Sequence, residues 1–222
     1  MTDVVIPVKS LMEAKSRLQW ILSPSERANL VLAMLRGILS CLQTIDLGNI
    51  WLVSSDDEVL DEGNRLGARP LQEEFAAGYN QAVLTGLRAV AHRHSALVLP
   101  ADLPFLKKSE VTKMIAPVGH EATLIRIAPD EKKQGTNSLF LSSPDLIKPA
   151  FGHNSFFNHL FAANSAGIVA RTMLLPSLAF DVDTPNDLIA FEAQNNSGSA
   201  SNFHKSISFG FASEKESKGV II

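Results

Sequence analysis

The chain has 222 residues, of which 45% are apolar, so it can bury a sizeable core. Its 20 basic and 23 acidic residues give a net charge of -3, which argues against a general nucleic-acid-binding surface. One cysteine excludes an internal disulfide and a cysteine zinc site, and the sequence shows neither a signal-peptide pattern nor the ~20 apolar residues that a membrane span needs. We therefore expect a cytoplasmic enzyme or binding protein that has neither nucleic acid nor membrane as a partner.

Short apolar segments alternate with helix-like stretches, which is typical of an α/β protein whose mostly parallel sheet is covered by helices on both faces. Strands are predicted at 4–8, 50–54, 96–99, 122–127, 138–141, 169–175 and 178–180. Helices are predicted at 58–66, 78–91, 108–115, 155–163 and 185–193, with a further helix between the first two strands. That further helix has the clearest start, because Ser23, Pro24 and Glu26 match an N-cap, an N1 proline and the N3 residue of a capping box. Cys41 lies off its polar stripe and is expected to be a core residue rather than a nucleophile.

The composition changes after Gln194. Residues 195–222 contain seven serines and three glycines and show no helical periodicity. We therefore expect one domain, 1–193, followed by a mobile tail, 194–222. Ile207, Phe209 and Phe211 alternate, which leaves open a strand that the tail adds to its own sheet or to a partner subunit in a homodimer.

Cations cluster after the first predicted strand, where Lys9, Lys15 and Arg17 fall within nine residues. Ligands of open parallel sheets bind at the carboxyl ends of the strands. At such a place lysines act as point charges and arginine as a bidentate fork, and together they can contact a polyphosphate. A solvated basic loop is the alternative.

Acidic residues follow two other predicted strands. Asp102 comes after the strand at 96–99, and Asp181 and Asp183 come after the strand at 178–180. Residues two apart in extended backbone point to the same side, so Asp181 and Asp183 can present paired carboxylates to a metal. Mg2+ prefers such oxygen ligands when it bridges substrate phosphates. Either acidic segment could instead cap the helix that follows it.

Two loops place glycine beside polar side chains. The first contains Gly135 and Thr136, and the second contains Gly152 and Ser155. The second loop precedes a predicted helix whose N-terminal N–H groups favour an anion, although each loop is also compatible with an ordinary turn. The six histidines show no zinc spacing.

Taken together and in order, these segments resemble the guanylyltransferases of coenzyme F420 biosynthesis over about residues 3–193. The resemblance is carried by Ile6-Pro-Val-Lys9, Ala14-Lys15-Ser-Arg17-Leu18, Leu22-Ser-Pro24, Pro100-Ala-Asp102-Leu-Pro104, Pro129-Asp130, Gly135-Thr136-Asn137, Phe151-Gly152, Ser155-Phe156, His159 and Asp181-Val-Asp183-Thr-Pro185. The resemblance implies a three-layer, nucleotidyltransferase-like α/β fold. It also implies the transfer of GMP from GTP to a phosphorylated three-carbon acid, with release of pyrophosphate.

The resemblance further implies a role for each candidate residue. The expected Mg2+ ligands are Asp102, Asp181 and Asp183, and the expected catalytic cations near the phosphates are Lys9, Lys15 and Arg17. The expected contacts to the phospho-acid are Thr136, Gly152 and Ser155, and Asn80 is a candidate for guanine binding. The acceptor is left open among 2-phospho-L-lactate, phosphoenolpyruvate and 3-phospho-D-glycerate, because the chain departs from the family pattern at 73–80, Gln134 and His153-Asn154.

Three other classes of protein compete with this interpretation. A molybdopterin or sugar-phosphate nucleotidyltransferase would share the sheet, but it would have a glycine-rich loop where this chain has Val8-Lys9-Ser10-Leu11-Met12. A GT-A glycosyltransferase would carry its D-x-D motif nearer to the middle of the chain. A non-catalytic nucleotide-binding protein would have no use for three acidic positions beside a cationic loop.

Overall fold

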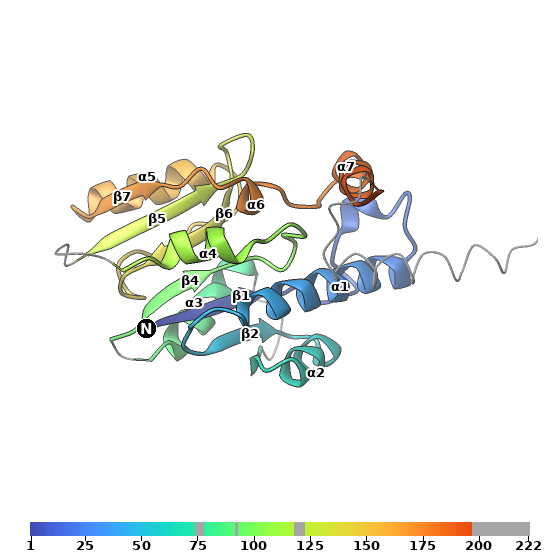
Figure 1. Cartoon of the computed structure of the whole chain (residues 1–222), viewed down its shortest axis with the longest axis horizontal. Coiled ribbons are helices and arrows are strands. Elements are labelled where there is room, and N and C mark those ends of the chain that lie inside the picture. The colour runs from blue at the N-terminus through green and yellow to red at the C-terminus, as the bar shows by residue number, and fades with distance from the viewer. Residues whose placement is uncertain (74–77, 92, 118–122, 197–222) are drawn as a thin grey trace, which may run out of the picture.

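The computed structural model describes residues 1–73, 78–91, 93–117 and 123–196 (Figure 1). Within these residues a seven-stranded sheet in the order β3-β2-β1-β4-β6-β5-β7 forms the centre of the molecule. The strands are β1 (Thr2–Pro7), β2 (Ile50–Ser54), β3 (Arg69–Gln72), β4 (Ser95–Val98), β5 (Leu124–Pro129), β6 (Thr136–Leu141) and β7 (Val169–Thr172). Among the strand pairs of the described residues, the two that involve β6 are antiparallel and the others are parallel. The predicted α/β class with a mostly parallel sheet is therefore confirmed.

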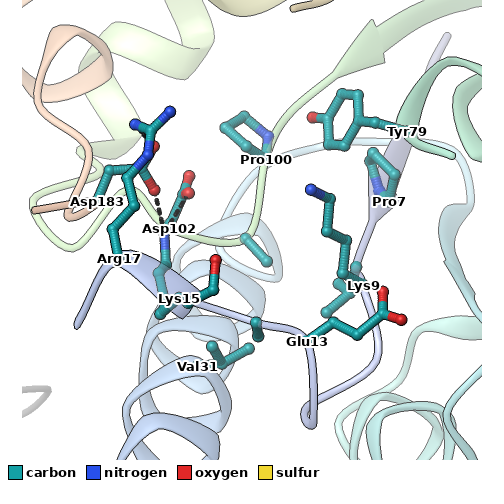
Figure 2. Close-up of a pocket in the computed structure, with 14 residues that line it drawn as sticks. Pro7, Lys9, Glu13, Lys15, Arg17, Val31, Tyr79, Pro100, Asp102 and Asp183 are labelled. Atoms are coloured by element: carbon teal, nitrogen blue, oxygen red, sulfur yellow. Dashed lines mark hydrogen bonds and ion pairs between the residues drawn. The ribbon is translucent and has the colours of Figure 1, made fainter. Parts of the chain in front are cut away.

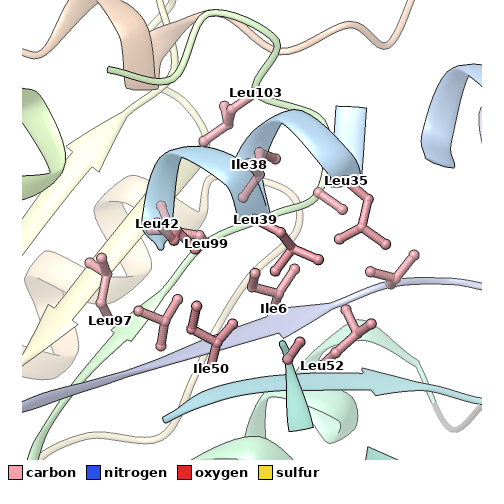
Figure 3. Close-up of a cluster of buried hydrophobic side chains, with 14 of the residues drawn as sticks. Ile6, Leu35, Ile38, Leu39, Leu42, Ile50, Leu52, Leu97, Leu99 and Leu103 are labelled. Carbon is pink, nitrogen blue, oxygen red and sulfur yellow. The ribbon is translucent and has the colours of Figure 1, made fainter. Parts of the chain in front are cut away.

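Helices cover both faces of the sheet. One face carries α1 (Pro24–Leu42), α2 (Asp57–Arg65), α4 (Lys108–Ile115) and α6 (Pro176–Ala179), and the other carries α3 (Tyr79–Ala89) and α5 (Ser155–Ser165). The side chains of β1 alternate between these layers, because successive residues of a strand point to opposite faces. Val4 and Ile6 pack toward α1, whereas Val5 packs toward α3. Figure 3 shows Ile6 between β1 and the Leu35 and Leu39 side chains of α1. This alternation produces the expected three layers.

Four elements differ from the sequence prediction. The strand predicted at 178–180 is wrong, since Leu178 and Ala179 lie in the short helix α6 and Phe180 follows its end. Pro176 begins this helix, at the first position, where proline is favoured. The sequence pattern does not indicate β3, because its four residues show no apolar alternation and are mostly exposed. β3 lies at the edge of the sheet, the position in a sheet that tolerates Pro70. β5 is shifted toward its C-terminal end relative to the prediction, and β7 ends at Thr172.

The start of α1 forms as the sequence predicts. The Ser23 hydroxyl accepts a hydrogen bond from the Glu26 N–H at 3.3 Å, and the Glu26 carboxylate accepts one from the Ser23 N–H at 2.7 Å. Together these bonds make the capping box. Near the other end of α1, Cys41 is partly buried, and burial raises the pKa of its thiol. Cys41 is therefore less buried than the core position that the sequence predicts, and a protonated thiol is a poor nucleophile, as expected.

A separate buried cluster lies beyond the end of the sheet, where α7 (Pro185–Asn196) packs against the N-terminal half of α1 (Figure 1). Val182 and Phe191 meet Leu30 and Met34 in this cluster, and Leu18 joins them from the loop after β1. The cluster therefore fixes both the loop that carries the predicted cations and the segment that precedes α7. The remainder of the predicted tail, 197–222, lies outside the described residues. None of the described helices combines the length and the apolar character that a membrane crossing requires.

Candidate active site

A pocket opens at the edge of the sheet where β1 and β4 end (Figure 2). It has a volume of about 330 Å³. Its charged lining residues are Lys9, Glu13, Lys15 and Arg17 from the segment after β1, Asp102 after β4, and Asp183 before α7. These segments meet because β1 and β4 are adjacent and parallel, so both chains leave the sheet at the same edge. The three predicted cations and two of the three predicted acids therefore share one pocket.

Lys15 is the central charged group of this pocket. Its ammonium donates hydrogen bonds to Asp102 Oδ2 at 2.6 Å and to Asp183 Oδ1 at 2.9 Å, and its side chain is only 7% exposed. Burial alone would lower the pKa of this ammonium, but the two carboxylates outweigh burial and hold the pKa above its usual range. Lys15 thus stays charged and ties together two acids that lie far apart in the sequence.

The backbone of the loop after β1 directs Lys15 toward these acids. Lys15 has a φ of 51°, in the left-handed region that non-glycine residues seldom adopt. The loop is held on its other side by Asp56, which accepts hydrogen bonds from the Leu11 N–H at 2.9 Å and from the Ser10 hydroxyl at 3.1 Å. Leu11 and Ala14 are buried in the core beneath the loop. These contacts fix the direction in which Lys15 leaves the backbone.

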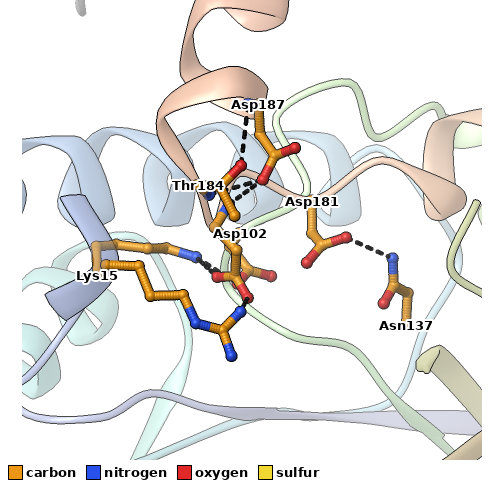
Figure 4. Close-up of polar contacts among 8 residues, drawn as sticks. Lys15, Asp102, Asn137, Asp181, Thr184 and Asp187 are labelled. Carbon is orange, nitrogen blue, oxygen red and sulfur yellow. Dashed lines mark hydrogen bonds and ion pairs between the residues drawn. The ribbon is translucent and has the colours of Figure 1, made fainter. Parts of the chain in front are cut away.

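Asp102, Asp181 and Asp183 form one carboxylate cluster, and Figure 4 shows Asp102 and Asp181 within it. One oxygen from each lies within 4.8 Å of those of the other two. Burial, together with the negative charges of Asp102 and Asp183, raises the pKa of the Asp181 carboxyl to about 6. The Asn137 amide donates a hydrogen bond to Asp181 Oδ1 at 3.3 Å and so orients this acid. The single Lys15 ammonium offsets one of the three negative charges that these acids carry when ionised, so the cluster has charge left for a divalent cation, and its oxygen donors suit Mg2+.

The segment with Asp181 and Asp183 differs from its prediction in one respect, because it follows the helix α6 rather than a strand. The two side chains still converge, because the intervening Val182 is fully buried and its N–H donates to the Asp102 carbonyl oxygen at 3.3 Å. After Asp183 the chain enters α7, where the Asp187 carboxylate accepts hydrogen bonds from the Asp183 and Thr184 N–H groups at 3.1 and 2.6 Å. Asp187 therefore caps the helix and leaves the Asp183 carboxylate available to the cluster.

The predicted acceptor residues come together in a second group, next to the carboxylate cluster. Thr136 begins β6 rather than lying in a loop, and its N–H donates to Ser155 Oγ at 2.8 Å. Because β6 runs antiparallel to β4, its first residues lie at the same edge as the end of β4. Gly152 has a φ of 115°, which only glycine adopts without strain, and an added Cβ would meet no atom within 4 Å. Asn137 joins the two groups, since it follows Thr136 in β6 and its side chain binds Asp181.

Asn80 contacts the backbone of the loop before α5. Its side-chain amide donates to the Phe151 carbonyl oxygen at 3.0 Å, and its amide oxygen accepts from the Phe151 N–H at 2.8 Å. Both ends of the side chain are therefore bonded to the backbone of the loop before α5. The structure gives Asn80 a role in holding that loop, and the guanine-binding role stays an untested prediction.

Three residues at the site received no role from the sequence. Tyr79 lines the pocket and makes an edge contact with Phe151, with ring centroids 5.2 Å apart. Burial and the nearby Asp102 raise the pKa of its phenol, so it stays a hydrogen-bond donor. Asn137 orients Asp181, and His159 binds Thr136. Tyr79 could have been singled out from the sequence, because it is an aromatic residue that directly follows Gly78 at the start of a predicted helix. Asn137 and His159 could not, because their hydrogen-bond partners are brought to them only by the fold.

The fold is shared with solved nucleotidyltransferase structures. The chain superposes on a nucleotide-diphospho-sugar transferase from Desulfovibrio desulfuricans with a TM-score of 0.71 and 16% identity, covering 95% of each chain. A nucleotidyl transferase from Methanothermobacter gives a TM-score of 0.65 at 12% identity, covering 87% of this chain and 97% of that one. At these identities the likeness shows the fold, and it confirms the expected nucleotidyltransferase-like architecture.

The sequence comparisons define the family. Residues 2–221 match the family model described as "Guanylyl transferase CofC like". The chain is 40% identical over 191 residues to the phosphoenolpyruvate guanylyltransferase of Rubrobacter xylanophilus, covering 85% of this chain and 92% of that protein. It is 32% identical over 219 residues to the 2-phospho-L-lactate guanylyltransferase of Methanocaldococcus jannaschii, covering 97% of this chain and 93% of that protein. The chain therefore belongs to the CofC-like guanylyltransferase family, and it is a nucleotidyltransferase.

Proposed function

We propose that this protein transfers GMP from GTP to the phosphate of a phosphorylated three-carbon acid in coenzyme F420 biosynthesis. The observation that carries the proposal is the cluster of Asp102, Asp181 and Asp183 around Lys15 at the edge of the sheet, in a member of a guanylyltransferase family. Two relatives at 40% identity are named phosphoenolpyruvate guanylyltransferase, which favours phosphoenolpyruvate as the first acceptor to test. The soluble substrates favour a cytoplasmic enzyme.

In this proposal the carboxylate cluster holds Mg2+, because its three acids supply the oxygen ligands that this ion prefers. When bound, the ion neutralises charge on the polyphosphate. Lys15 holds Asp102 and Asp183 in place through its two hydrogen bonds. The Lys9 ammonium points between Pro100 and Tyr79 (Figure 2), from where it can contact a nucleotide phosphate. Arg17 is 72% exposed and lies 3.6 Å from Asp183, so it is free to turn toward phosphate oxygens at the mouth of the pocket.

The proposed reaction is a direct displacement. A phosphate oxygen of the acceptor forms a bond with the α-phosphorus of GTP, the bond between the α-phosphorus and the bridging oxygen to the β-phosphorus breaks, and pyrophosphate leaves with that electron pair. The attacking phosphate has a second pKa of about 6 and is largely ionised near neutral pH, so the step needs no strong general base. It also needs no protein nucleophile. The protein contributes position and positive charge. Thr136, Gly152 and Ser155 would hold the phospho-acid.

The test combines purified protein with GTP and Mg2+ and offers phosphoenolpyruvate, 2-phospho-L-lactate and 3-phospho-D-glycerate in separate reactions. Pyrophosphate release and the mass of the product are measured. We expect a guanosine-diphospho acid with at least one acceptor, and no product from the Asp102→Asn variant. Asp61→Asn is the matched control, because Asp61 is an exposed carboxylate on α2, away from the pocket. If GTP binds but no acid is converted, the proposed guanylyl transfer fails.

A further inference from the structure

His159 lies at the centre of a buried hydrogen-bond chain beside the proposed acceptor residues. It projects from α5 and has no exposed surface. Its Nε2 accepts a hydrogen bond from the Ala150 N–H at 2.9 Å, and its Nδ1 lies 2.9 Å from Thr136 Oγ1. The Phe151 ring meets the imidazole edge-on, with centroids 4.8 Å apart. Both ring nitrogens of His159 are therefore used.

The partner of Nε2 determines the tautomer. A backbone N–H can only donate, so Nε2 must carry a lone pair, and a neutral imidazole then has its proton on Nδ1. Thr136 Oγ1 consequently accepts from His159. The neutral ring also agrees with its surroundings, because burial lowers the pKa of His159 to about 4.

The same reasoning shows that the hydroxyl groups of Thr136 and Ser155 both act as acceptors toward the protein. Thr136 Oγ1 accepts from His159, and Ser155 Oγ accepts from the Thr136 N–H. Each hydroxyl therefore keeps its own proton for a further bond, and in the part of the chain that the structure describes neither proton is donated to a protein acceptor. A ligand group that offers lone pairs and no proton, such as an ionised carboxylate or phosphate, satisfies both hydroxyls.

We propose that His159 is a positioning residue that fixes the Thr136 hydroxyl as a hydrogen-bond donor to an oxyanion of the phospho-acid acceptor. This inference rests on the proposed function. It explains why a histidine that bonds none of the three carboxylates lies beside the acceptor residues. It also gives the acceptor site a preference for groups that accept hydrogen bonds.

Two substitutions separate the contacts of His159. His159→Asn places an amide N–H near the position of Nδ1 and can still donate to Thr136, whereas His159→Gln places an amide oxygen near Nε2 and keeps only the Ala150 bond. We expect His159→Gln to raise KM for the phospho-acid about tenfold, the usual worth of one hydrogen bond to a charged group, with KM for GTP unchanged. His159→Asn should stay within about threefold of the wild type. Equal losses in both variants would assign His159 to packing and overturn the inference.

Coupling to Thr136 gives the second criterion. If His159 acts through the Thr136 hydroxyl, His159→Gln should add little to the loss that Thr136→Val already causes. Multiplying losses would mean that the two residues act independently, which contradicts the inference.

Two readouts that need no turnover separate this inference from the proposed function. The nitrogen chemical shifts of His159 should report a neutral ring with its proton on Nδ1, and a proton on Nε2 would overturn the inference even in an active enzyme. Calorimetry should show tighter binding of phosphoenolpyruvate to the wild type than to Thr136→Val. Failure of GTP transfer in the wild type, with both of these results in place, would remove the proposed reaction and keep the positioning role of His159.

Discussion

Replacement of Lys15 by methionine tests whether the buried ammonium stabilises the carboxylates of Asp102 and Asp183. Methionine is unbranched like lysine and has the same backbone strain at a φ of 51°, but it lacks the ammonium that bonds Asp102 and Asp183. Removing one partner of a buried ion pair costs about 3 to 5 kcal/mol, and the 42% exposure of the Asp183 side chain reduces this to about 2 kcal/mol. For a domain of this size the expected loss in Tm is about 4 to 8 °C.

Thermal unfolding without divalent cations and then with added Mg2+ measures this effect. The ion should stabilise Lys15→Met more than the wild type, because the variant has three acids and no ammonium among them. Arg17→Met is the matched control. Arg17→Met removes a cation that is 72% exposed and 3.6 Å from the same Asp183. The Tm of this variant should therefore change by less than a quarter of the change expected for Lys15→Met. A Lys15→Met variant as stable as the wild type, or equal stabilisation of both by Mg2+, would refute the reasoning.

Three further outcomes follow from the contacts at the site and in the core. Asp183→Asn should lower turnover about a hundredfold or more with the fold intact, and near-normal rates would remove Asp183 from the metal site. Asn80→Ala should raise KM for the phospho-acid several-fold through the loss of about 1 kcal/mol per bond to Phe151, while a rise in KM for GTP alone would point to guanine binding instead. Asp3→Asn should cost about 2 kcal/mol of unfolding free energy near neutral pH in urea titrations, because fully buried Asp3 accepts hydrogen bonds from the Trp51 indole and the His94 ring. Burial opposes the charge of Asp3, but these bonds hold its pKa below the usual value. The contribution of Asp3 to the free energy of unfolding is therefore present above about pH 4 and falls at lower pH. A destabilisation by Asp3→Asn that grows on acidification would contradict this.

Local signals were sufficient for the elements that the sequence predicts well. The start of α1 is specified by Ser23 and Glu26, which bond each other within one turn. β1 is specified by an apolar run that both faces of the sheet bury. β3 could not be predicted, because it exists only through pairing with β2 and has little apolar sequence of its own. The segment at 178–180 has the apolar character of a strand, but Pro176 starts a helical turn, and Leu178 is a buried residue of that helix.

The candidate site was predictable in its composition and not in its contacts. Asp102 could be located because acids that follow buried strands face the ligand edge of a parallel sheet. The hydrogen bonds of Lys15 to Asp102 and Asp183 join residues that are 87 and 168 positions apart in the sequence, and no local sequence pattern predicts such contacts. The same holds for Asn80, whose amide could equally bind a base or a backbone until the fold places Phe151 against it.

The fate of the α-phosphorus of GTP tests the central claim most directly. GTP radiolabelled at that atom is incubated with the protein, Mg2+ and phosphoenolpyruvate, and parallel reactions contain 2-phospho-L-lactate or 3-phospho-D-glycerate. The labelled products are separated, and their masses are measured by mass spectrometry. We predict that the label moves into a guanosine-diphospho acid while unlabelled pyrophosphate is released. Label that stays in GTP with all three acids, or that appears only in free GMP, would contradict guanylyl transfer at this site.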